Sequence, residues 1–210
     1  KYLLPSHDGL VIDSILKHFE PAGLFDEVVF ACHKKDATFK RIIESRKTFF
    51  PNSAVDFVYL SNTSSQVETA KLALLASNST SSFDKPCLFA NIDTILMSRD
   101  YKQVADLLAT NHGFLDGFRA FDKHYSYLLA NENGEVSSIR EKVLISEYAC
   151  SGLYGINSPR TFLSSPEVKN NQFHNFSEFF QNLIDQGKSV VCKIEPLDKN
   201  TLVLGSPAQY

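Results

Sequence analysis

The segment from Cys87 to Asp93 places polar side chains directly after an apolar run. Cys87–Ala90 is typical of a buried strand, and it ends in the polar residues Asn91 and Asp93. Ligands of open α/β sheets bind at the carboxyl ends of the strands, and Mg²⁺ prefers carboxylates together with substrate phosphates. Asp93 is therefore a candidate Mg²⁺ ligand. The alternative is that its carboxylate only caps the segment that follows.

Two lysines and a glutamate are candidates for contacts with a phosphorylated substrate. Lys1 and Lys142 could serve phosphates as point charges. Glu141 precedes Lys142 at the end of an expected strand, so a regular strand would send the two side chains to opposite faces. The alternative is an ordinary solvated ion pair at a strand end.

Gln66 is a candidate for reading a nucleotide base. Ser65 and Glu68 have the spacing of a capping box, which places Gln66 in the first turn of a helix. Its amide offers both a donor and an acceptor, as base recognition requires. The alternative is an exposed residue at a helix start.

The composition limits the classes of protein. The 210 residues suit a single α/β domain, with 43% hydrophobic and 21% charged residues and a net charge of −3. This charge argues against a nucleic-acid partner. No apolar run reaches the length of a membrane span and the start lacks a signal-peptide pattern, so we expect no membrane partner and a cytoplasmic protein. The four cysteines have no close spacing and are expected to be reduced core thiols.

The apolar periodicity and the turn signals predict an alternation of strands and helices, which favours an α/β fold with a mixed, mostly parallel central sheet flanked by helices. Expected helices cover residues 10–19, 36–47, 66–75, 101–108 and 177–187. In the second of these, Phe39, Ile42 and Ile43 are expected to face inward. Expected strands cover residues 28–32, 55–60, 87–93, 117–121, 124–130, 136–141, 149–156, 189–194 and 201–204.

Taken in order, the motifs resemble those of the sugar nucleotidyltransferases, the pyrophosphorylase-type enzymes that make nucleotide sugars. The likeness is greater to members encoded among bacterial capsule and surface-polysaccharide genes. The segments that carry the resemblance are Lys1–Pro5, Phe25–Val29, Ser65–Ala70, Asn91–Asp93, Ser126–Lys142, Ser151–Tyr154 and Leu204–Pro207.

The resemblance implies a fold shared with A-type glycosyltransferases and a reaction between a nucleoside triphosphate and a sugar 1-phosphate that releases pyrophosphate. It implies that three residues have catalytic roles: Lys1 on phosphate, Asp93 on Mg²⁺ and Lys142 on the sugar phosphate. It also implies four substrate-binding residues, with Gln66 on the base, Asn91 beside the metal aspartate, Glu141 on sugar hydroxyls and Gly152 allowing close approach of the sugar. A homo-oligomeric state stays open.

Two departures from the family pattern bear on catalysis. The family's Gly-rich phosphate loop precedes the segment that matches Lys1–Pro5, so we expect the single domain of residues 1–210 to lack that loop and its strand. A second metal carboxylate is expected two residues before the late glycine, where this chain has Val203.

Two other functions therefore remain as alternatives. One is a binding or regulatory protein with this fold and no turnover. The other is a cytidylyltransferase with a non-sugar phosphate acceptor. An aromatic pocket that can bind a cation would favour this alternative.

Overall fold

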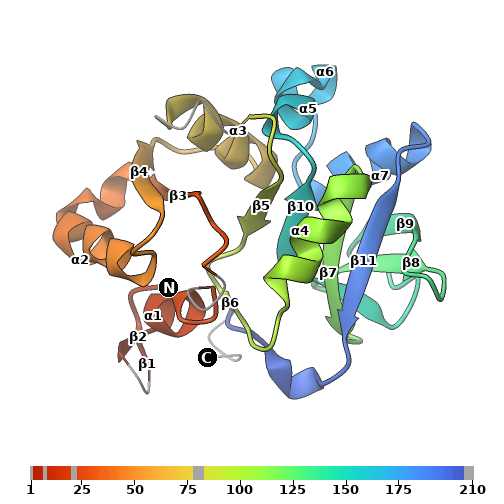
Figure 1. Cartoon of the computed structure of the whole chain (residues 1–210), viewed down its shortest axis with the longest axis horizontal. Coiled ribbons are helices and arrows are strands. Elements are labelled where there is room, and N and C mark those ends of the chain that lie inside the picture. The colour runs from red at the N-terminus through yellow and green to blue at the C-terminus, as the bar shows by residue number, and fades with distance from the viewer. Residues whose placement is uncertain (1, 7–8, 20–22, 78–82, 206–210) are drawn as a thin grey trace.

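A computed structural model of the chain describes residues 2–6, 9–19, 23–77 and 83–205, so Lys1 lies outside the described residues. The strands are β1 (Pro5–Ser6), β2 (Gly9–Leu10), β3 (Glu27–His33), β4 (Ala54–Leu60), β5 (Cys87–Ala90), β6 (Thr94–Leu96), β7 (Gly113–Arg119), β8 (Ser126–Ala130), β9 (Val136–Glu141), β10 (Tyr148–Ile156), β11 (Val190–Glu195) and β12 (Thr201–Val203) (Figure 1). The helices are α1 (Val11–Leu16), α2 (Lys40–Glu44), α3 (Gln66–Ala76), α4 (Tyr101–Thr110), α5 (Pro159–Ser164), α6 (Pro166–Lys169) and α7 (Phe176–Asp185), with 3₁₀ segments η2 (Lys34–Phe39), η3 (Ser45–Phe49) and η5 (Asp198–Asn200).

The main sheet is built around β10. This strand pairs antiparallel with β7 on one side and with β5 and β8 on the other, and β11 pairs parallel with β7. Strands β5, β7 and β11 therefore run in the same direction, although β10 separates β5 from β7. The mixed α/β fold expected from the sequence is confirmed, and its pairings are more often antiparallel than the chain order predicted because β10 lies between strands that run parallel.

Alternating side chains of the sheet form two cores, one on each face. Phe114 belongs to a core with α1 and α4, whereas the next residue, Leu115, belongs to a core with α3, α5, α6 and α7. Leu153 and Tyr154 on β10 divide in the same way. This follows from the two-residue period of strands, and it explains why β7 and β10 have nearly continuous apolar sequences.

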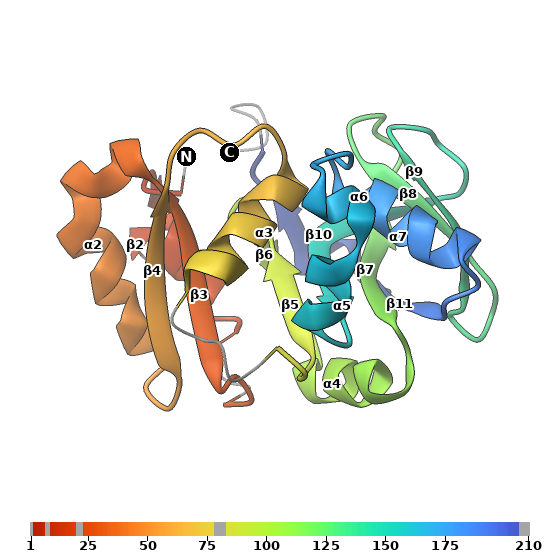
Figure 2. The same cartoon turned by 90° about the horizontal axis from the view of Figure 1, so that it is seen from above.

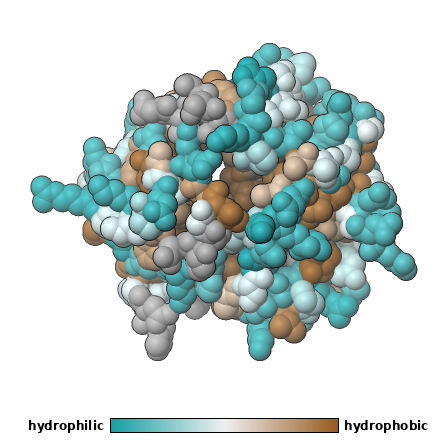
Figure 3. Space-filling view, in the orientation of Figure 1, coloured by the Kyte–Doolittle hydropathy of each residue, from teal (hydrophilic) through white to brown (hydrophobic). Residues whose placement is uncertain are grey.

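Strands β3 and β4 form a separate parallel pair. Figure 2 shows that β3, β4 and β5 point their carboxyl ends to the same side of the molecule. In the described part of the chain, no strand pairing joins β3 to β5. The space-filling view shows a hollow between these two halves, with apolar side chains on part of its rim (Figure 3). One side of β3 and one side of β5 thus lack a neighbouring strand among the described residues.

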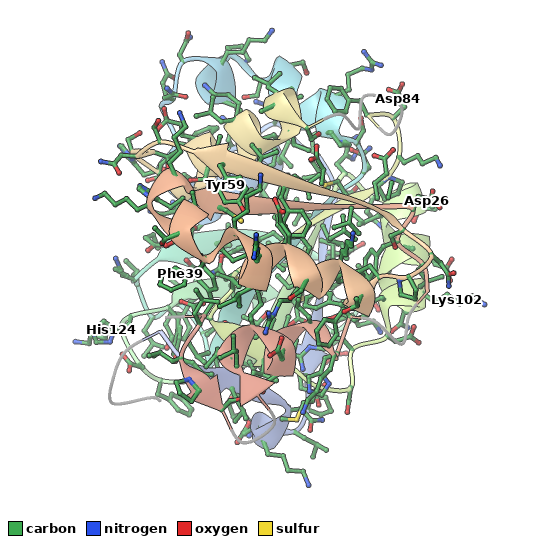
Figure 4. All side chains as sticks on the ribbon, turned by 90° about the vertical axis from the view of Figure 1, so that its left-hand side faces the viewer. Asp26, Phe39, Tyr59, Asp84, Lys102 and His124 are labelled. Atoms are coloured by element: carbon green, nitrogen blue, oxygen red, sulfur yellow. The ribbon has the colours of Figure 1, made fainter. Side chains whose placement is uncertain are left out.

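The segment after β3 differs from the single helix expected over residues 36–47. It consists of η2, α2 and η3. The side chain of His33 caps its start by accepting a hydrogen bond from the amide of Lys35. Because 3₁₀ turns change the angular phase, only Ile43 is buried, while Phe39 is 47% exposed and Ile42 is 44% exposed. Figure 4 looks onto this side of the molecule, with Phe39 and Tyr59 labelled.

Candidate active site at the carboxyl edge of the sheet

Asn91 and Asp93 lie where β5 ends, as the sequence predicts. The main-chain amide of Asn91 donates a 2.9 Å hydrogen bond to the carbonyl of Gly152, and the carbonyl of Asp93 accepts one of 2.7 Å from Leu204. The segment after Asp93 is strand β6, and helix α4 has its own cap, Asp100. The alternative role of Asp93 as a helix cap is therefore wrong, and its half-buried carboxylate stays at the strand end.

Gly152 lies in a bulge of β10. The register with β7 shifts between Cys150 and Tyr154, and Gly152 has a φ of +93°. A Cβ atom there would lie 2.7 Å from Nδ2 of Asn91. Glycine is thus required both by the backbone angle and by the close approach of Asn91.

Glu141 and Lys142 form a pair at the end of β9. The hydroxyls of Ser126 and Ser177 both donate hydrogen bonds to the Glu141 carboxylate. The bond from Ser177 is 3.0 Å long. The ammonium of Lys142 lies 3.6 Å from Glu141, and its side chain is 63% exposed. A regular strand would send the two side chains to opposite faces, but the strand ends at Glu141 and Lys142 has a φ of +55°, so that condition is not met.

A pocket of about 300 Å³ lies beside Glu141, between β9 and α7. Its lining includes the Phe173 ring and, besides Glu141, the carboxylates of Glu178 and Asp185. Glu178 is engaged in capping α7, where its carboxylate accepts hydrogen bonds from the amides of His174 and Asn175. The Glu141 carboxylate, by contrast, is held by the hydroxyls of Ser126 and Ser177 and by the ammonium of Lys142.

Gln66 is the first residue of α3 and is exposed. The cap is the expected one, since the hydroxyl of Ser65 accepts a 2.9 Å hydrogen bond from the amide of Glu68. The Glu68 carboxylate reaches Ser64 rather than the cap residue. The main-chain N–H of Gln66 donates a hydrogen bond to the main-chain carbonyl of His174, which lies just before α7. Gln66 is therefore linked to the helix whose Ser177 holds Glu141.

The structure brings most of the expected site residues to one edge. Asn91 contacts Gly152 directly, and Asp93 follows two residues later. Burial is the main cause that raises the pKa of Tyr154, and smaller contributions come from the charges of Cys150, Glu141 and Asp93. Lys1 is outside the described residues, and its contact with phosphate stays a prediction.

Comparisons with known proteins agree with this arrangement at the level of the fold. No family model and no curated protein matches the sequence. The chain is similar to the solved structure of a nucleoside-diphosphate-sugar pyrophosphorylase from Vibrio cholerae, with a TM-score of 0.83 and 18% identity over 100% of this chain and 89% of that one. The chain has the nucleotidyltransferase fold.

Other solved structures with this fold are similar over the whole chain. HddC from Yersinia pseudotuberculosis, complexed with GMP-PN, has a TM-score of 0.72 and 17% identity, with 86% of that chain covered. The inositol-1-phosphate CTP transferase from T. maritima has a TM-score of 0.72 and 13% identity, with 82% of that chain covered. Identities this low establish the architecture of the chain alone.

At this edge Asp93 is the residue expected to hold a metal ion, and that expectation stays a prediction. Among the described residues, no group of three or more His, Cys, Asp and Glu side chains is placed to hold a metal. Val203 pairs with Thr94, beside Asp93, at the position where a second carboxylate was expected. One carboxylate suits Mg²⁺ bound mainly by water and substrate phosphates.

Sequence reasoning missed a buried charged cluster behind this edge. Arg99 donates to the Asp116 carboxylate at 2.8 Å and lies 3.3 Å from that of Glu195, and all three side chains are at most 8% exposed. Burial raises the pKa of Asp116, although Arg99 opposes the shift. The signal in the sequence was an aspartate within the apolar run of β7, but nothing local paired it with an arginine 17 residues away.

The cysteines are free thiols, as expected. Burial raises the pKa of Cys32 and of Cys192 to about 11, and that of Cys87 to about 12. Such thiols stay protonated at neutral pH, so they are poor nucleophiles. The helices of the described residues include none with the length and apolar character needed to cross a lipid bilayer.

Proposed function

We propose that this protein transfers a nucleotidyl group from a nucleoside triphosphate to a sugar 1-phosphate. A phosphate oxygen of the sugar phosphate attacks the α-phosphorus and forms the new P–O bond. The bond from the α-phosphorus to the bridging oxygen breaks, and pyrophosphate leaves with that oxygen. Such chemistry needs positioning and charge neutralisation more than covalent help from the protein.

The observation that carries this proposal is the set of groups at the carboxyl edge of a nucleotidyltransferase fold. Gly152 lets the Asn91 side chain pack directly against the backbone of β10, which fixes Asn91 at the edge where the acceptor is proposed to bind. Glu141 presents a carboxylate to the pocket between β9 and α7, where it could accept hydrogen bonds from sugar hydroxyls. Lys142, next to it and exposed, would bind the acceptor phosphate.

Asp93 is the residue proposed to hold Mg²⁺, which when bound would neutralise charge on the triphosphate. Because Val203 replaces a second carboxylate, the protein alone should bind the ion weakly. Gln66, exposed at the start of α3, is proposed to contact the base.

We further propose that the working enzyme contains one more strand between β3 and β5, followed by a glycine-rich phosphate loop. The strand edges that lack a neighbour among the described residues, and the hollow beside them, support this proposal (Figure 3). A strand in that position would place a following loop, together with Asp93, at the carboxyl edge.

A nucleotide-binding protein without turnover is the second candidate, favoured by the single carboxylate at the expected metal site. A cytidylyltransferase with a non-sugar acceptor is a further variant. It is favoured by the aromatic side chain of Phe173 in the pocket lining, which could contact a cationic acceptor. A role in surface-polysaccharide synthesis and a cytoplasmic location are proposals that rest on the sequence resemblance and on the four free thiols.

The test uses the polypeptide that carries these residues, at its natural length, with Mg²⁺, five nucleoside triphosphates in turn and a panel of sugar 1-phosphates, inositol 1-phosphate and choline phosphate. Release of pyrophosphate with a sugar 1-phosphate supports the proposal, and release only with a non-sugar acceptor supports the cytidylyltransferase variant. Nucleotide binding by calorimetry without any release would replace both by the binding protein.

A further inference from the structure

The bulge that contains Gly152 has an unusual partner on the neighbouring strand. Cys150 on β10 is opposite Gly117 on β7, and Tyr154 is opposite Leu115. The three residues Ser151–Leu153 therefore face the single residue Asp116. A bulge of this size needs something to fix its shape, because its extra residues have no regular ladder partners.

Ser151 connects the bulge to Asp116. The register places Ser151 opposite Asp116, and a hydrogen bond from the Ser151 hydroxyl is among the interactions that work to lower the pKa of the Asp116 carboxyl, against the larger effect of burial. The same hydroxyl oxygen accepts a 3.3 Å hydrogen bond from the amide of Leu153. Ser151 is 3% exposed, so its hydroxyl interacts with these partners without competition from water. The hydroxyl thus bridges the two ends of the Gly152 turn.

Arg99 fixes Asp116 in turn. Its guanidinium makes a two-pronged contact, with Nε 3.0 Å from Oδ1 and the second terminal nitrogen 2.8 Å from Oδ2 of Asp116. It also donates to the carbonyls of Met97 and Asn200 and to the hydroxyl of Thr201. Because a guanidinium is planar and makes several directed bonds, it holds the carboxylate in one orientation.

The bulge is in direct contact with the proposed acceptor site. The Gly152 carbonyl accepts the 2.9 Å hydrogen bond from Asn91, and the Gly152 Cα lies against the Asn91 side chain. A shift of the bulge would therefore move Asn91 as well, and Asp93 lies two residues further along the same segment.

We propose that Arg99, Asp116 and Ser151 are positioning residues that set the distance between Gly152 and Asn91 and thereby the fit of the phosphate acceptor. The expected change in KM rests on the proposed function, whereas the effect on the contact between Gly152 and Asn91 can be measured without turnover. The nucleotide base, proposed to bind at Gln66 at the start of α3, should be insensitive to the bulge.

Ser151→Ala tests this inference, because it removes one oxygen and keeps the buried charges paired. We expect the KM for the acceptor to rise about tenfold or more, since small misplacements at reacting groups are costly, while the KM for the nucleotide stays unchanged. Ser151→Thr, which retains the hydroxyl, should restore most of the loss. Ser77→Ala is the matched control, because Ser77 is also buried and hydrogen-bonded, at the other end of α3.

Hydrogen exchange separates failure of this inference from failure of the proposed function. In Ser151→Ala the amide of Asn91 should exchange faster than in the wild type, while the amides of α7 keep their rates. Unchanged exchange at Asn91, or an equal rise in both KM values, would overturn the inference. If the wild type shows no turnover, the proposed function fails, and the exchange of Asn91 still decides the positioning role.

Discussion

The backbone of Gly152 and the side chain of Asn91 touch so closely that no larger residue fits at position 152. A Cβ atom there would lie 2.7 Å from Nδ2 and 3.0 Å from Cβ of Asn91. The contact joins the middle of β10 to the end of β5, two elements more than 50 residues apart in sequence. It makes the geometry of the proposed acceptor site depend on a single backbone conformation.

Gly152→Ala should therefore impair both folding and acceptor binding. The positive φ and the clash together predict a loss of about 1–3 kcal/mol in the free energy of unfolding, measured by urea titration. The KM for the acceptor should rise as Asn91 is displaced. Gly134→Ala is the matched control, because that glycine also has a positive φ and a Cβ there would lie 2.8 Å from the Cys192 carbonyl oxygen, away from the site. Equal effects of the two variants on the acceptor KM would contradict the role of Gly152.

Lys142→Met should separate binding from stability. The lysine is largely exposed and its ion pair with Glu141 is loose, so the free energy of unfolding should change by no more than about 0.5 kcal/mol. Because the variant lacks the ammonium that is proposed to contact the acceptor phosphate, the acceptor KM should rise about tenfold, equivalent to about 1.4 kcal/mol. Lys102→Met, on the exposed side of α4, is the control that should change neither quantity (Figure 4). A normal acceptor KM in Lys142→Met would remove this lysine from the site.

Asp116→Asn should change how stability depends on pH. Burial raises the pKa of Asp116 in the folded protein, so the folded state retains a proton at pH values where the unfolded chain has released it. This contribution to stability is present below the unfolded pKa of about 3.9 and is lost as the pH rises through the folded pKa. The free energy of unfolding of the wild type, relative to Asp116→Asn, should therefore fall as the pH is raised from about 4 towards neutrality. If urea titrations show that this relative stability rises over the same interval, Arg99 lowers the pKa of Asp116 by more than burial raises it.

The parts of the site that the sequence predicts are those with local signals. Asn91 and Asp93 follow an apolar strand, and Ser65 caps α3 as the spacing indicates. Both patterns depend on neighbours within a few residues, where the periods of strands and helices are informative.

The parts that sequence reasoning missed depend on partners far along the chain. Asp116 was unremarkable until the fold placed it opposite Ser151 and beside Arg99. The segment over residues 34–49 has a helical pattern, but its 3₁₀ turns change which side chains face the core, so Phe39 and Ile42 are exposed. Likewise the cap of α7 is Asn175, which precedes the helix expected over residues 177–187, and the Ser177 hydroxyl binds Glu141.

The most direct test of the central claim is pyrophosphate release by the natural-length polypeptide with Mg²⁺, a nucleoside triphosphate and a sugar 1-phosphate, compared with its Asp93→Asn variant. Asp106→Asn, which changes an exposed carboxylate on α4, is the control. We predict turnover by the wild type and the control, and a loss of at least about a hundredfold in Asp93→Asn, as expected when an electrostatic contact to the reacting phosphates is removed. Equal turnover by the Asp93→Asn variant, or none by the wild type with any substrate pair, would contradict the account.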